Sequence, residues 1–300
     1  MARKSRNQSP DLVGTTPLGF GAEDALSVLG RARVVSAATP PRATLPLDAT
    51  PPARTADEVY AAVYWRTKDL LALGRTAGLV AQAVANAQKI ADAAWGAQRP
   101  AVESRAKAFD CAKGCSWCCH QQVAVSPGET LAIARYLETS MTPEAREKIL
   151  DRVRRTDDKT RGMPAIKRRE TQLPCPFLED GACGVHPARP MRCRGFFSRD
   201  VGLCRFTFDH PRTGVDDPRW QQNDVLPREP TRLFDAALRG LATALHEAGL
   251  ESETLELAAA VRVAVDRPEA FEAWIRGEPD LAEARLPPRT PGGAPPSRKG

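Results

Sequence analysis

The feature that most constrains this chain is the placement of its cysteines. The 300-residue sequence has eight cysteines, all from Cys111 to Cys204, with none in the first 110 or the last 96 residues. No apolar run approaches the roughly 18 residues of a membrane span, and no apolar core of a secretory signal follows the charged start. We therefore expect a cytoplasmic chain, in which clustered cysteines indicate metal binding or redox chemistry rather than disulfides.

These cysteines fall into two groups with spacings typical of metal ligands. The first group has the pattern Cys-x3-Cys-x2-Cys-Cys, and the second follows about 56 residues later in a stretch rich in glycine and proline turns. Zinc sites and iron–sulfur clusters both need several thiolates that converge from tightly turned loops. The candidate metal ligands are Cys111, Cys115, Cys118, Cys119, Cys175, Cys183, Cys193 and Cys204.

The adjacent pair Cys118 and Cys119 leaves the number of sites open. In an extended segment their side chains point opposite ways and do not bind one ion together, whereas a turn relaxes this restriction. One site with spare thiols, two neighbouring sites and a polynuclear cluster all fit. Structural disulfides and a metal-free reactive thiol pair are weaker alternatives, because no export signal is present and the pair lacks the C-x-x-C spacing of redox motifs.

The segments around the cysteines predict a mostly helical fold. We expect helices flanking a central, turn-rich, cysteine-lined metal-binding domain, with disordered N- and C-terminal tails. Ser126–Glu129 reads as a capping box that starts a helix, Pro100 as the end of a long one, and 161–172 as a loop. The predicted units are a tail over 1–56, a helical segment over 57–104, the cysteine domain over 105–210, helices over 211–284 and a tail over 285–300.

The net charge of +6 comes from the predicted tails. Residues 1–56 carry seven basic and four acidic side chains, and residues 285–300 carry four basic and no acidic ones. The middle of the chain is therefore near neutral, which argues against a nucleic-acid-binding face. A metal ion is the expected partner, no membrane partner is expected, and a protein partner stays open.

Several side chains near the cysteines have two interpretations. His120 and His186 are either metal ligands or polar loop residues, and Glu129 is either a general base or the capping-box carboxylate. Basic side chains near the thiols would offset the negative charge of thiolates, and aromatic ones would exclude water from the site. The basic residues are Lys113, Arg189, Arg192, Arg194 and Arg199, and the aromatic ones are Trp117, Phe196 and Phe197.

The same residues carry a family resemblance. The segment from Phe109 to His120, the Ser126–Glu129 box, the Cys175-Pro-Phe-Leu segment with Cys183, and Arg189-Pro-Met-Arg-Cys-Arg-Gly-Phe196 resemble the bacterial CxxCxxCC cysteine-cluster family. This resemblance covers about 105–205 and implies a zinc- or iron-chelating domain. It carries over seven of the candidate cysteines as ligands, all except Cys204, which matches a less fixed position of the family. Val185-His186 departs from the family pattern.

The sequence therefore predicts a protein that binds zinc or iron, either as single ions or as an iron–sulfur cluster. It does not decide whether the chain is an enzyme, since no Walker loop, H-E-x-x-H or G-x-G-x-x-G motif occurs. Three hypotheses follow. The first is a non-catalytic module whose loops are held together by bound metal. The second is an iron–sulfur protein that transfers electrons or supports a protein-modifying enzyme, and the third is a metal carrier.

Overall fold

The fold is mostly helical, as predicted, in the residues that the structure describes. This structure is a computed structural model that describes residue 40, residues 53–278 and residues 280–287. Most of both predicted tails lies outside those residues. At the inner margins, Ala53 is buried and Arg285 pairs with Leu255, so the packed chain extends a few residues further in each direction than the predicted boundaries.

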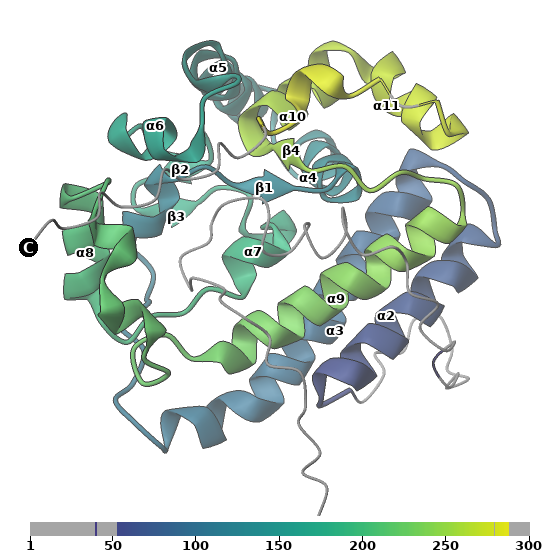
Figure 1. The fold of residues 1–300 in the computed structure, drawn as a ribbon. Coiled ribbons are helices and arrows are strands. Elements are labelled where there is room, and N and C mark those ends of the chain that lie inside the picture. Colours follow the sequence, from purple (N-terminus) through teal and green to yellow (C-terminus); the bar gives the residue numbers. More distant parts are fainter. Residues whose placement is uncertain (1–39, 41–52, 279, 288–300) are drawn as a thin grey trace, which may run out of the picture.

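One side of the molecule is built from three long helices, with α9 packed across both α2 and α3 (Figure 1). The three are α2 (Ala56–Leu71), α3 (Ala77–Glu103) and α9 (Arg228–Glu247). Thr55 and Glu58 form a capping box that starts α2, and Thr76 caps α3. Gly74, with φ of 140°, lies in the break between these helices.

Pro100 does not end α3, contrary to the sequence expectation. The helix continues to Glu103, and the amide of Ser104 donates to the carbonyl of Pro100. Proline removes its own amide donor and crowds the carbonyl four residues before it, but the residues after it keep their amides, so the last turn forms downstream of Pro100.

The other side of the molecule contains a second helical group. Its members are α4 (Pro127–Thr139), α5 (Pro143–Thr160), α10 (Leu257–Asp266) and α11 (Pro268–Arg276). The predicted capping box at Ser126 and Glu129 is confirmed at the start of α4. A short antiparallel pair, β1 (Ala124–Val125) with β4 (Leu255–Glu256), connects the segment after the first cysteine group to the C-terminal helices.

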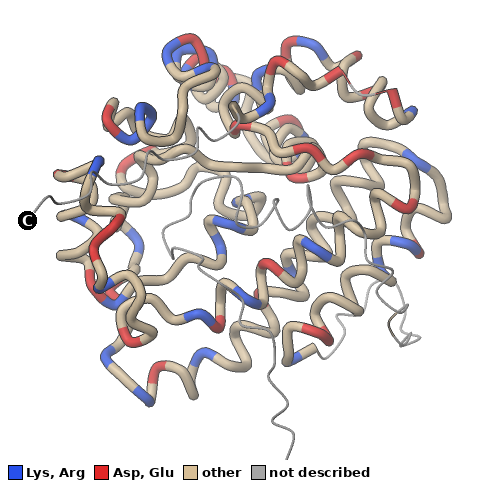
Figure 2. The backbone as a smooth tube through the Cα atoms, viewed as in Figure 1, with Lys and Arg blue, Asp and Glu red and all other residues tan. Residues whose placement is uncertain are grey.

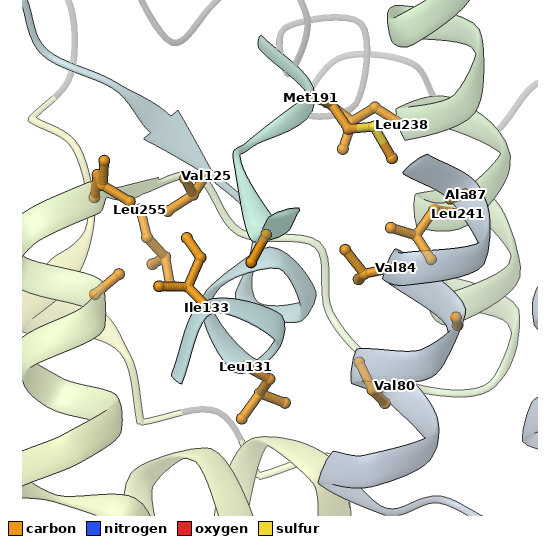
Figure 3. Close-up of a cluster of buried hydrophobic side chains, with 14 of the residues drawn as sticks. Val80, Val84, Ala87, Val125, Leu131, Ile133, Met191, Leu238, Leu241 and Leu255 are labelled. Atoms are coloured by element: carbon orange, nitrogen blue, oxygen red, sulfur yellow. The ribbon is translucent and has the colours of Figure 1, made fainter. Parts of the chain in front are cut away.

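A continuous hydrophobic core joins the two helical groups. Figure 3 shows buried side chains from α3, α4, α9 and the two strands gathered around the start of α4. Ile133 and Val84 are fully buried there, and Met191 reaches the same core from the second cysteine group. Because Met191 lies two residues before Cys193, the core directly supports the segment that carries this thiol.

The cysteine region contains short elements between the two helical groups (Figure 1). They are η1 (Trp117–His120), α6 (Ala165–Glu170), β2 (Leu178–Glu179), β3 (Ala182–Cys183), η2 (His186–Ala188), α7 (Met191–Arg194), α8 (Val201–Asp209), η3 (Gly214–Asp216) and η4 (Pro218–Gln221); η5 (Ala282–Ala284) lies near the C-terminal end. The loop expected over 161–172 therefore contains a short helix, and α8 forms where only turns were expected. Neither segment is long enough for its periodicity to stand out in the sequence.

Charges of both signs are interspersed along the described chain (Figure 2). Many are paired across elements: the buried carboxylate of Asp157 in α5 pairs with Arg161 and with Arg262 of α10. Among the described residues, no helix is both long and apolar enough to cross a membrane.

The contact between α2 and α9 yields a stability prediction. A Cβ at Gly240 would lie 2.5 Å from the carbonyl oxygen of Tyr60, whereas one at Gly96, an exposed position of α3, would meet nothing within 4 Å. We expect Gly240→Ala to lower the free energy of unfolding by about 1–3 kcal/mol through overpacking. Gly96→Ala should raise it by about 0.5–1 kcal/mol through helix propensity. Denaturant melts of both variants check the opposite signs, and equal shifts would contradict the close helix contact.

Candidate metal centre

The first cysteine group is a tight turn followed by a short 3₁₀ helix. The amide of Cys115 donates to the carbonyl of Ala112, and Gly114 adopts φ of 98° in this turn. The 3₁₀ helix η1 then places Cys118 and Cys119 on a turn rather than on extended backbone, and their side chains are hydrogen-bonded to each other. The geometric objection to using both thiols at one centre therefore does not apply.

The second group is distributed over a hairpin and two short helices. Cys175 precedes the hairpin, Cys183 lies in β3, Cys193 in α7 and Cys204 in α8. The hairpin turn is Asp180-Gly181 with φ of 48° and 72°, as two-residue turns require, and glycine meets this at no steric cost. Each thiol thus sits on backbone that is fixed locally by hydrogen bonds.

The structure brings the two groups together along their length. The amide of Cys175 donates to the carbonyl of Cys119 at 2.6 Å, and the amide of Asp110 donates to the carbonyl of Ser198 at 3.0 Å. A Cβ on Gly181 would lie 3.2 Å from the Cα of Gly114, so the two turns are in close contact. These contacts join segments more than 50 residues apart, as the metal-centre hypothesis requires.

The thiols form two overlapping sets, and Cys118 belongs to both. A negative charge on Cys118 raises the pKa of Cys111, Cys115 and Cys204 in the first set and of Cys183 and Cys193 in the second, so Cys118 lies near thiols of both groups. Ser198 connects Cys111 with Cys204, because its amide donates to the Cys111 sulfur at 3.2 Å and its hydroxyl is hydrogen-bonded to Cys204. Cys175 interacts with Cys193 and Cys183.

Burial favours the neutral form of these thiols. It raises the pKa of Cys193 and of Cys204 to about 12, and it raises the pKa of Cys175 further. The hydrogen bond with Cys119, followed by burial, raises the pKa of Cys118. Since metal ligation needs thiolates, a bound cation would have to displace these protons, and metal binding would release them.

All eight cysteines are free thiols and partly buried. Within the described part of the chain, no three His, Cys, Asp or Glu side chains are already arranged as a group that could hold a metal ion. Coordination therefore requires the thiol side chains to turn toward a common point. The chemistry of the donor set, soft sulfur atoms from two adjacent segments, fits zinc or iron.

Of the basic residues expected near the thiols, Arg189 has the clearest electrostatic coupling to them. Burial alone would lower its pKa, but Cys193, Cys118 and other nearby thiols raise it overall. Arg192 pairs with Asp235 and Arg194 with Asp92, while Arg199 donates to the carbonyl of Val102 and lies over the Phe109 ring. Lys113 is exposed.

Sequence reasoning missed Arg168, which lies in the segment 161–172 that was expected to be a loop. It is only 2% exposed, and its Nη1 donates to the carbonyls of His120 and Leu173 at 3.2 and 2.9 Å. Burial lowers the pKa of its guanidinium, and attraction to Glu256 and Cys175 opposes this. A tribasic stretch in sequence carries no signal that its middle member points inward.

The two histidines are held by neighbours other than sulfur. His120 has Nδ1 3.1 Å from the carbonyl oxygen of Ser116 and packs edge-on against Phe208, and His186 is exposed, with Arg189, Arg194 and Asp92 as its charged neighbours. Burial lowers the pKa of both histidines, which favours the neutral form of each ring. Metal ligation by these histidines is not required to explain their placement.

Aromatic side chains flank the cysteine segments. Trp117 packs against Phe208 of α8 at 5.3 Å between ring centroids, and Phe197 packs against Phe109 and Trp95. Phe196 contacts Trp220 in a small separate cluster that also packs against Cys204. These rings join α3, α8 and η4 to the sides of the thiol cluster, as expected for side chains that limit water access.

Comparison with known protein families matches this region. Residues 110–211 match the family model CxxCxxCC, described as "Putative zinc- or iron-chelating domain". The chain carries a CxxCxxCC domain. Searches of curated proteins and of solved structures each gave no match. The CxxCxxCC domain begins one residue before the first thiol and ends after α8, so it includes every cysteine of the chain, and its description supports metal binding.

The raised thiol pKa values predict slow alkylation of the CxxCxxCC domain after chelation. At pH 8, a pKa of about 12 leaves Cys193 and Cys204 with a thiolate fraction roughly a thousandfold below that of an ordinary thiol. Their iodoacetamide reaction, followed by peptide mass spectrometry, should be at least about a hundredfold slower than in urea-unfolded protein. The rate should rise with pH up to about 12. Equal rates in folded and unfolded protein would show that burial does not control these thiols.

Proposed function

We propose that this chain binds zinc or iron as thiolate complexes shared between its two cysteine groups. The proposed ligands are drawn from Cys111, Cys115, Cys118, Cys119, Cys175, Cys183, Cys193 and Cys204. The observation that carries the proposal is the contact between the two groups, in which the amide of Cys175 donates to the carbonyl of Cys119 and the amide of Ser198 donates to the sulfur of Cys111. When bound, the metal centre supplies either a structural cross-link or, as an iron–sulfur cluster, one-electron chemistry.

The number of thiols supports more than one metal ion. A tetrahedral zinc ion takes four ligands, so eight thiols exceed the need of one ion. Two ions or a polynuclear cluster would use the two overlapping sets, with Cys118 between them. An iron–sulfur cluster is therefore the second candidate, and the partly buried cation Arg189 would reduce the negative charge of either centre.

Metal and sulfide analysis tests the proposal directly. The full chain purified without oxygen should contain zinc and be colourless, or contain iron with acid-labile sulfide and be brown until dithionite bleaches it. Either result supports thiolate binding. A folded chain that retains neither metal, even after incubation with Zn²⁺ or with iron and sulfide, would contradict the proposal.

One substitution in each cysteine group tests whether both contribute ligands. We expect Cys115→Ser and Cys193→Ser each to lower the metal content per chain and the thermal stability, because serine oxygen is a poor substitute for thiolate sulfur. His210→Ala is a matched control, since this exposed side chain of the same domain stacks on Phe206 outside the thiol cluster. Elemental analysis gives the readout, and wild-type metal content in both cysteine variants would refute the ligand assignment.

A further inference from the structure

Two buried side chains of opposite charge connect the cysteine groups without using sulfur. We propose that Glu129 and Arg168 are positioning residues that hold the thiols of both groups together before metal binds. This inference rests on the proposed function for its purpose, but its geometry does not depend on a metal. Its consequence is a site that can lose and regain metal in a chain that stays folded, unlike a small domain that only metal can fold.

Glu129 connects the segment after the first cysteine group to the segment 191–193, which carries Cys193. Its side chain is 2% exposed, and its Oε2 accepts hydrogen bonds from the amide and the hydroxyl of Ser126 at 2.9 and 3.0 Å. A capping box needs only that oxygen. The other oxygen, Oε1, accepts from the amide of Met191 at 2.8 Å, across 62 residues of sequence. This second bond fixes the start of α7 two residues before Cys193.

Arg168 connects the end of the first cysteine group to the segment 173–175, which carries Cys175. One nitrogen, Nη1, donates both to the carbonyl of His120, one residue after the cysteine pair, and to that of Leu173, two residues before Cys175. The amide of Cys175 donates to the carbonyl of Cys119 in the same place. Nε of Arg168 is buried with no hydrogen-bond partner among the described residues. Burying this guanidinium costs desolvation free energy. The hydrogen bonds that Arg168 donates to the carbonyls of His120 and Leu173 offset part of that cost and explain why the side chain is buried.

Together Glu129 and Arg168 connect two segments of the second group, 173–175 and 191–193, to the single segment 119–129. The second group also contributes Phe177, Val185 and Met191 to the main core, and each of these side chains is buried almost completely. Buried charged groups that accept or donate several hydrogen bonds fix one arrangement strongly, because an alternative arrangement would leave a buried charge without hydrogen-bond partners. The spacing of the thiols is therefore set by carboxylate, guanidinium and core contacts rather than by the metal.

Disulfide trapping in metal-free protein tests this positioning. After chelation, diamide takes two hydrogen atoms from each pair of thiols that meet and leaves a disulfide, which peptide mass spectrometry maps. We expect cross-group disulfides between 111–119 and 175–204 to form about tenfold faster in the parent than in Glu129→Gln or Arg168→Met. Far-UV circular dichroism should show that all chelated proteins remain helical.

Two matched controls separate positioning from general stability. Ser126→Ala removes the hydroxyl of the same capping box but leaves the bond from Glu129 to Met191, and Arg161→Met breaks a partly buried ion pair of α5 away from the cysteine segments. Both should trap at the parent rate. Arg168→Lys, which keeps a donor and a positive charge, should recover part of the loss. If Arg168→Met does not fold, Glu129→Gln and Arg168→Lys still decide the result.

Metal retention in the same variants distinguishes the failure of this inference from the failure of the proposed function. Zinc or iron per chain after dialysis against increasing chelator should fall at about 10- to 100-fold lower chelator in Glu129→Gln and Arg168→Met than in the parent and controls. If the parent protein binds no metal, the proposed function is refuted. The rates of disulfide trapping still test whether Glu129 and Arg168 position the thiols. Equal trapping in all proteins, or loss of helical signal on chelation of the parent, overturns the positioning.

Discussion

The rest of the structure depends on the contact between the two cysteine groups, where the amide of Cys175 donates a hydrogen bond to the carbonyl of Cys119. Thiols separated by more than 50 residues must lie side by side, and loop closure over that length costs conformational entropy. The fold offsets this cost with contacts that have no direct part in metal chemistry. The start of α4, the β1–β4 pair and the hydrophobic core hold the first group on one side, and Met191 and Phe177 anchor the second on the other.

Burial and ligation make opposite demands on the same sulfur atoms. Burial of Cys193 and Cys204 raises the pKa of each to about 12, which favours neutral thiols, whereas a zinc or iron centre needs thiolates. The positive charge of the partly buried Arg189 favours the anionic form of the nearby thiols. A site with these properties binds metal more strongly as pH rises, because each bound thiolate releases a proton that would otherwise compete for sulfur.

Local patterns in the sequence predicted the parts of this structure that depend on neighbours along the chain. The Ser126–Glu129 box and the helices within the segment 57–104 are set by caps and apolar periodicity within a few residues. The eight candidate thiols came from spacing alone, and the structure places both groups together. The missed helix α8 and the short helix α6 owe their placement to side-chain contacts with distant segments, such as Trp117 on Phe208 and Arg168 on His120.

The missed roles of Glu129 and Arg168 have one physical cause. A carboxylate has two oxygens, and the sequence accounts for only the one that completes the capping box; the partner of the other, Met191, is 62 residues away. A guanidinium in a basic run looks solvated until the fold brings two carbonyls to it. Spacing in a sequence can therefore identify the atoms that bind a metal, because ligands must be of a few chemical types. The residues that hold those ligands in place can be of any type that forms hydrogen bonds, so only the three-dimensional arrangement identifies them.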